Sequence, residues 1–145
     1  MTLRHCFAAV AFAGVLAACS SGPPKRITPS VVSIQELATQ SDGQWRLSLR
    51  VQNYSTVAMQ YETIHATLYI AGVDVGTLDL KPALDIPPNS ADVFQASLRS
   101  SAKLPGGEFE YRIEGTIDTS EPKEHFKFNR TSRLSPAPGL PGTWR

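Results

Sequence analysis

The sequence predicts an all-β protein, an antiparallel β-sandwich of about seven strands. Two segments alternate strictly between apolar and polar residues, which is typical of strands with one buried face. Clusters of turn-forming residues separate the apolar segments at spacings near ten residues. The pattern contains no amphipathic helix of useful length. About 100 residues are available to the strands, which is enough for a core without disulfides.

The two alternating segments are the best-defined predicted strands. The first covers residues 45–52 and places its apolar side chains on one face, namely Trp45, Leu47, Leu49 and Val51. The second covers residues 108–118 and places four apolar side chains together, namely Phe109, Tyr111, Ile113 and Ile117. Gly115 falls on the same row, which indicates a bulge or the close approach of a neighbouring strand.

Weaker alternation predicts the remaining strands, which cover residues 31–37, 57–61, 64–70, 73–80, 91–98 and 123–134. The apolar phase changes at Glu62 and Thr63, which predicts a bulge or a bend between two sheets. Ala71 and Gly72 are expected to form a hairpin turn. The rest of the expected core comes from these strands: Ile64, Leu68, Ile70, Phe94, Leu98 and Phe126.

The N-terminus has the pattern of an export signal. An apolar run of residues 6–16 follows a short basic start, and it is too short to span a bilayer of about 30 Å. Leu16, Ala17, Ala18 and Cys19 then resemble the lipobox of bacterial lipoproteins. This resemblance implies that residues 1–18 are a signal peptide and that Cys19 becomes the acylated first residue. An ordinary secretory signal and a short uncleaved anchor are the alternatives.

Lipidation would fix the location of the chain. Acyl chains on Cys19 make the membrane the first expected partner, and more than one chain makes attachment lasting. Ser20 after the cysteine resembles lipoproteins sorted to the outer membrane, so we expect a lipid anchor there with the domain facing the periplasm. Residues 19–30 are rich in Pro and Ser and are expected to form a semi-stiff tether. Residues 135–145 are rich in Pro and Gly and are expected to form a disordered tail.

Composition and motifs give little sign of chemistry. The chain has 145 residues with 14 Lys and Arg against 13 Asp and Glu, so its net charge of +1 lacks the basic excess of a nucleic-acid binder. His65 and His125 fall on outward strand positions and have no metal-ligand spacing. A row of carboxylates on residues 108–118 is expected to be a solvated face. We therefore expect no catalytic residues, no metal and no cofactor, and we do not expect an enzyme.

One local pattern resembles a known family. The strand of residues 47–53 ends in Asn53, Tyr54 and Ser55, and the order of segments through residue 133 is similar to the water stress and hypersensitive response (WHy) domain of type 2 late embryogenesis abundant proteins. In that family a strand ends at Asn-Pro-Asn, and only Asn53 of this motif is present here. Asn53 suits a strand end because its side chain can hydrogen-bond to local backbone and the residue tolerates left-handed geometry.

The resemblance implies an immunoglobulin-like or fibronectin-III-like sandwich at residues 31–134 and a protective role in desiccation or osmotic stress, without catalysis. Weakly bound protein clients would be its partners. Two alternatives stay open. One is a module that binds or assembles an envelope partner through edge strands or loop ends. The other is a carrier for an apolar ligand in a cavity lined by residues such as Leu49, Ile70, Phe94 and Phe126. Trp144 in the tail is either a chance exposed aromatic or a docking handle.

Overall fold

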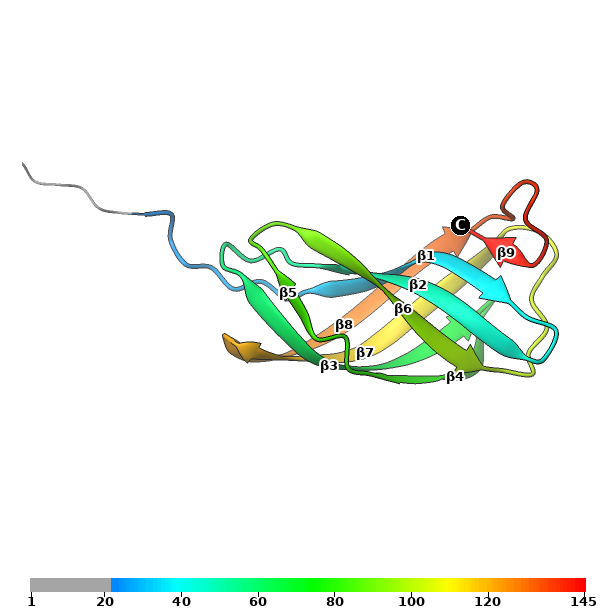
Figure 1. Ribbon diagram of the computed structural model, residues 1–145, viewed down its shortest axis with the longest axis horizontal. Helices are drawn as coiled ribbons and strands as arrows, with labels where there is room; N and C mark the ends of the chain where they lie inside the picture. Colours follow the sequence, from blue (N-terminus) through cyan, green and yellow to red (C-terminus); the bar gives the residue numbers. More distant parts are fainter. Residues whose placement is uncertain (1–21) are drawn as a thin grey trace, which may run out of the picture.

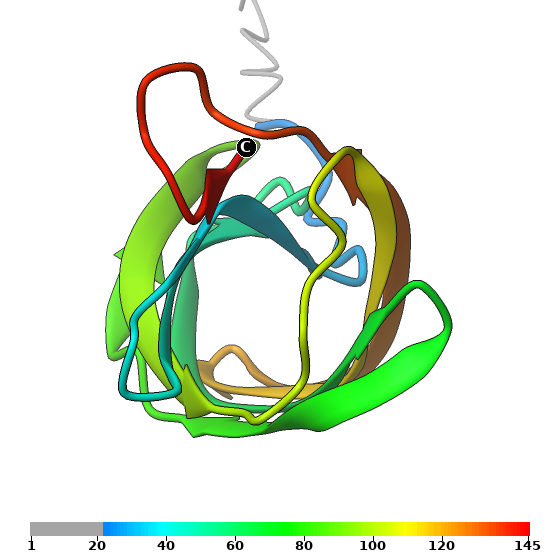
Figure 2. The same cartoon turned by 90° about the vertical axis from the view of Figure 1, so that its right-hand side faces the viewer.

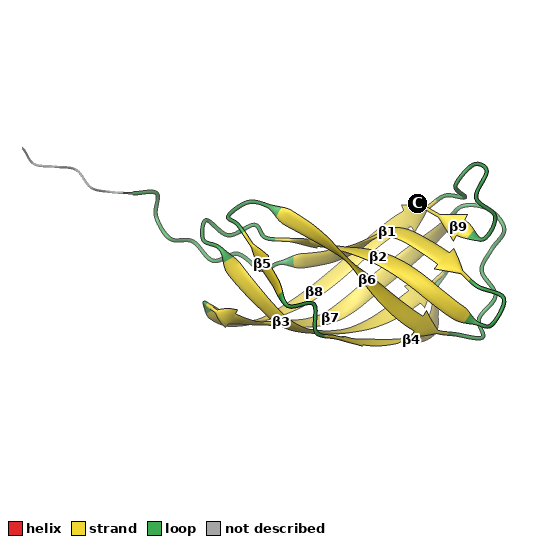
Figure 3. Cartoon of the chain, viewed as in Figure 1, coloured by secondary structure: helices red, strands yellow, loops and turns green. Residues whose placement is uncertain are grey.

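The structure is a computed structural model and describes residues 22–145, which form two antiparallel β-sheets packed face to face (Figure 1). The first sheet has the order β6-β2-β1-β9, with bounds β1 (Val31–Thr39), β2 (Gln44–Gln52), β6 (Ala91–Arg99) and β9 (Thr143–Trp144). In this part of the chain the structure contains only strands and loops (Figure 3). It contains no helix long and apolar enough to cross a membrane.

The second sheet has the order β4-β3-β7-β8, and the short strand β5 pairs with the start of β3. Its bounds are β3 (Met59–Ile70), β4 (Val73–Leu80), β5 (Leu84–Ile86), β7 (Phe109–Glu121) and β8 (Lys123–Leu134). Without β5 and β9, seven long strands divide three and four between the sheets. The predicted all-β, immunoglobulin-like or fibronectin-III-like sandwich is therefore confirmed.

The core lies between the sheets, which curve toward each other when viewed along the long axis (Figure 2). The apolar rows predicted from alternation are buried, because one face of each strand points to the opposite sheet. Leu47, Leu49, Ile64, Leu68 and Ile113 are fully buried. Phe94 departs from the prediction and is only half-buried. It lies on β6, an edge strand, where the facing sheet does not cover the whole side chain.

The carrier alternative finds no support in the described part of the chain. Leu49, Ile70 and Phe126 belong to one packed cluster of buried residues, and Phe94 packs against that cluster. Five surface pockets of residues 22–145 are lined by residues other than these four.

Two predicted irregularities occur where the sequence places them. The pairing of β3 with β7 shifts register between Tyr61 and Thr63, so the phase change is a bulge within one sheet. Gly115 on β7 keeps its register and approaches β3 closely, since a Cβ atom there would lie 1.8 Å from the carbonyl oxygen of His65. Ala71 and Gly72 form the expected hairpin turn between β3 and β4, both with positive φ.

The C-terminal segment corrects the sequence analysis, because residues 135–145 fold back onto the sandwich. β9 pairs with the end of β1, with Trp144 opposite Leu37. The indole of Trp144 is 8% exposed, lies 5.7 Å from the ring of Phe109, and donates a hydrogen bond to the carbonyl oxygen of Gly107. Trp144 is therefore neither an exposed aromatic nor a docking handle.

Candidate functional site

The candidate site is built around Asn53, which follows the last residue of β2 and is fully buried. Its side-chain amide nitrogen donates to the carbonyl oxygens of Val57 (2.9 Å), Ile86 (3.1 Å) and Pro87 (3.1 Å). Its amide oxygen accepts a hydrogen bond from the backbone N–H of Ser55 at 2.8 Å. One side chain thus joins the loop after β2 to the end of β5 and the loop that follows.

The same loop holds the segment that precedes β1. The N–H of Thr28 donates to the hydroxyl of Ser55 at 2.9 Å, and that hydroxyl donates to the carbonyl of Thr28 at 3.2 Å. Thr56 exchanges hydrogen bonds with Arg26: its N–H donates to the carbonyl of Arg26 at 2.9 Å, and its hydroxyl accepts from the N–H of Arg26 at 2.8 Å. We call this arrangement the linker clasp; it consists of Asn53, Ser55 and Thr56 with Pro24, Arg26 and Thr28.

Ser30 completes the attachment of this segment. It is fully buried, and its hydroxyl lies 2.6 Å from the phenol oxygen of Tyr61 on β3. Burial raises the pKa of the Tyr61 phenol above its ordinary value of 10.0, and the hydrogen bond with Ser30 works in the opposite direction. The phenol is therefore a neutral hydrogen-bonding group at physiological pH. The expected semi-stiff tether of residues 19–30 needs correction, because residues 24–30 are bound to the sandwich.

The structure describes only some of the residues that the sequence predicts as sites. Cys19, Leu16, Ala17 and Ala18 lie outside the described residues, so lipidation stays a prediction. Asn53 forms the expected hydrogen bonds to nearby backbone, and its own φ is not positive. Its bonds to Ile86 and Pro87, more than 30 positions along the chain, had no signal in the sequence.

His65 and His125 lie on the outer face of the second sheet, as expected for surface side chains. His65 on β3 pairs with Asp79 on β4, and His125 on β8 pairs with Asp118 on β7, each with a nitrogen–oxygen distance of 2.6 Å. The hydrogen bond from His125 lowers the pKa of the Asp118 carboxyl, and a second hydrogen bond from Thr63 adds to this effect. These pairs bridge neighbouring strands in contact with solvent.

The acidic row of β7 is also a solvated face. Glu114 pairs with Arg112 on the same strand and accepts a hydrogen bond from Asn129, while Glu108, which precedes β7, pairs with Arg133 at 2.7 Å. Within residues 22–145 no group of three or more His, Cys, Asp or Glu residues is arranged to hold a metal ion.

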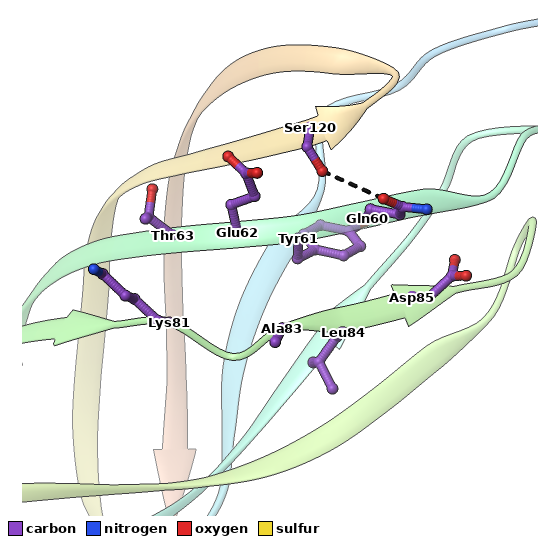
Figure 4. A pocket seen from close by; sticks show the side chains of 9 residues that line it. All are labelled: Gln60, Tyr61, Glu62, Thr63, Lys81, Ala83, Leu84, Asp85 and Ser120. Atoms are coloured by element: carbon purple, nitrogen blue, oxygen red, sulfur yellow. Dashed lines mark hydrogen bonds between the residues drawn. The ribbon is translucent and has the colours of Figure 1, made fainter.

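A surface pocket lies beside β3 where β4 ends and β5 begins (Figure 4). Its charged side chains are Glu62, Lys81 and Asp85. The hydroxyl of Ser120 donates to the amide oxygen of Gln60 at 3.4 Å, so this hydroxyl is bonded to a group that cannot act as a general base.

Comparison with known proteins gives information on the fold alone. No family model and no curated protein matches the sequence. A structural genomics target solved by X-ray crystallography is 19% identical to this chain, with a TM-score of 0.50 over 79% of this chain and 92% of that one. A crystal structure of a protein from Archaeoglobus fulgidus is 21% identical, with a TM-score of 0.43 over 72% and 96% of the two chains. A protein from Arabidopsis thaliana solved in solution is 9% identical, with a TM-score of 0.48 over 81% and 85%.

Proposed function

We propose that this chain is a lipid-anchored, non-enzymatic protein of the cell envelope that protects against desiccation and osmotic stress. The linker clasp is the observation that carries the proposal. It binds residues 24–30 to one end of the sandwich, so only five residue steps separate the lipobox cysteine Cys19 from the first bound residue, Pro24. A linker that served only as a spacer would not need hydrogen bonds to the sandwich.

The clasp limits the distance between the sandwich and an anchor on Cys19. A fully extended chain advances about 3.5 Å per residue, so Pro24 lies at most about 17 Å from an acylated Cys19. The N-terminal segment leaves the sandwich at the end opposite the C-terminus (Figure 1). The clasp end then faces the bilayer, and the end with the C-terminal segment and the β3–β4 turn faces away. With Ser20 as the sorting residue, the outer membrane is the expected membrane and the periplasm the expected compartment.

The protective role rests on the resemblance to the WHy domain and on the outer faces of the sheets. His–Asp pairs and other ion pairs cover the outer face of the second sheet. A rigid, hydrated face of this kind can touch many proteins weakly and keep them from associating, and it requires no catalytic group.

Survival of a deletion strain tests the protective role. We expect the deletion to reduce survival after drying and after hyperosmotic shock, and the full chain to restore survival. A matched strain carrying Cys19→Ala should restore it only partly, because the domain would not be held at the membrane. Equal survival of the deletion and parent strains under both stresses would contradict the proposal.

An assembly module in an envelope complex is the second candidate, and one observation favours it. β6 is an edge strand with an exposed apolar side chain, Val93, which is 45% exposed. An edge of this kind can accept a strand from another protein. Affinity purification of the full chain from membranes separates the two candidates. One partner in constant ratio supports assembly, whereas many substoichiometric proteins support protection.

A further inference from the structure

A hollow of about 250 Å³ lies on the outside of the sandwich, where the first half of β1 packs beside β8. β9 pairs with β1 only at Leu37 and Ala38, so this part of β1 has no strand bonded along its outer edge. The lining includes Arg50 and Gln52 of β2, Ser33 of β1, Arg130 of β8, and Tyr54. No carboxylate lines the hollow, so its ionised groups are both cations.

Arg130 occupies an unusual position for a charged residue. It stands on the core-facing row of β8, between Phe128 and Leu134, which are both buried. Its partner across the strand pair is the fully buried Ile113. Arg130 itself is exposed, because β8 is the last strand of its sheet and the side chain can leave the core at the seam with β1.

Arg50 is held in place by a chain of hydrogen bonds. Its guanidinium donates to the side-chain oxygen of Gln52 at 3.0 Å. The amide nitrogen of Gln52 donates in turn to the carbonyl oxygen of Ser90 at 3.1 Å, in the loop before β6. This arrangement orients the guanidinium and leaves its other N–H groups available, since an arginine has five donors.

The arginines of residues 22–145 divide into those with an ion pair and those without one, and Arg26, Arg46 and Arg99 belong to the second group. Arg112, Arg133 and Arg145 each form an ion pair with a glutamate. Arg50 and Arg130 form no ion pair with any residue of the described part of the chain. Two guanidinium groups on one hollow, with hydroxyl donors beside them and no anion, make a site for a multivalent oxyanion.

We propose that Arg50 and Arg130, with Ser33 and Tyr54 as neutral donors, bind a phosphate group. Guanidinium groups match phosphate oxygens in geometry and charge, and Arg is the usual residue for such recognition. The phosphate belongs either to a phospholipid headgroup or to a small phosphate ester. The site adds a ligand to the proposed function but does not depend on the lipid anchor, because every residue that forms it lies within residues 31–130.

Arg130 could instead serve only to protect an edge strand, because an inward charge on an edge prevents pairing with other chains. The two roles predict different results. Edge protection requires Arg130 alone, and its loss causes aggregation. Phosphate binding requires Arg50 as well, although Arg50 lies on a central strand of its sheet.

The test follows amide NMR shifts of the full chain in mild detergent, titrated with inorganic phosphate, glycerol 3-phosphate and short-chain phosphatidylglycerol. We expect saturable shifts at Ser33, Gln52 and Tyr54. Replacing both arginines (Arg50→Gln, Arg130→Gln) should weaken binding at least about tenfold, because two charge-assisted contacts are lost. Arg46→Gln is the matched control, since Arg46 lies on the same outer row of β2 outside the hollow.

The outcomes separate the possibilities. Tighter binding of phosphatidylglycerol than of glycerol 3-phosphate identifies a lipid headgroup as the ligand, and equal binding identifies a small phosphate ester. Absence of saturable shifts with all three probes would overturn the proposal, as would equal weakening by Arg46→Gln. If Arg130→Gln aggregates, the single variant Arg50→Gln still tests the proposal. Phosphate binding that is unchanged in Arg50→Gln would overturn the proposal.

Discussion

At the scale of single residues, Asn53 shows how much one buried side chain can organise. Its amide satisfies carbonyl oxygens from its own loop, from the end of β5 and from the loop after β5, and it accepts one N–H from its own loop, so several backbone groups depend on it. Only an amide of this length carries both a donor and an acceptor into the position. Asn53 therefore has a structural role in this chain.

Asn53→Asp should destabilise the fold strongly. The substitution keeps the shape but replaces the donor nitrogen with an oxygen that faces three carbonyl oxygens. We expect a loss of about 3 kcal/mol in the free energy of unfolding, because buried acceptors lose their donor and a charge is buried beside them. Urea denaturation measures the loss. Gln40→Glu, an amide-to-carboxylate change at an exposed position, should change it little, and equal effects of both substitutions would contradict this role of Asn53.

Gly115 is required because the backbone of β3 leaves no room for a side chain. A Cβ atom there would lie 1.8 Å from the carbonyl oxygen of His65, and backbone cannot move away as a flexible side chain can. We expect Gly115→Ala to cost about 3 kcal/mol or more, at the upper end for overpacking. Gly106→Ala is the matched control, because a Cβ atom at Gly106 meets nothing within 4 Å. Thermal unfolding midpoints that fall equally in both variants would show that close packing at Gly115 is not the cause.

At the scale of elements, alternation was clearest in two strands that each lie between two neighbours in their sheet. β2 and β7 have neighbours on both sides, so their inward rows are buried and the period of two is clear in the sequence. The prediction of buried inward rows is weaker on the edge strands β6 and β8. Phe94 on β6 is half-buried, and Arg130 stands on an inward row, because an edge strand is only partly covered by the facing sheet.

The C-terminal segment was mispredicted because its composition resembles a disordered tail. Its order comes from contacts that composition does not show. Gly139 and Gly142 have positive φ and allow the chain to turn back, and Trp144 then reaches Phe109. The turn-forming glycines and prolines followed by a tryptophan were the signal that could have indicated a closing turn.

Trp144→Ala should therefore destabilise the domain, which a substitution in a disordered tail would not do. We expect a loss of about 3 kcal/mol in the free energy of unfolding, since the indole packs against Phe109 and its N–H loses the carbonyl of Gly107. Leu140→Ala is the control in the same segment, because Leu140 is 45% exposed. Denaturation curves of the two variants check the difference. A stability unchanged by Trp144→Ala would mean that this segment does not contribute to the core.

At the scale of the whole molecule, the sandwich could be predicted and the linker clasp could not. Strand number and class follow from local pattern, but the clasp joins residues 24–30, the loop after β2 and the loop before β6, which are distant in sequence. Thr28, Ser55 and Thr56 give no pattern that distinguishes them from other loop residues. The closeness of Arg50 and Arg130 could not be predicted either, because only the packing of β1 beside β8 brings them to one hollow.

The proposed function depends most on the predicted lipid at Cys19, which the clasp would hold close to the sandwich. Intact mass spectrometry of the chain extracted from cell membranes tests this directly. We expect a protein that lacks residues 1–18, begins at Cys19, and carries the added mass of acyl chains. A chain with a free Cys19 thiol, or one that retains Met1 and is recovered without membranes, would contradict it.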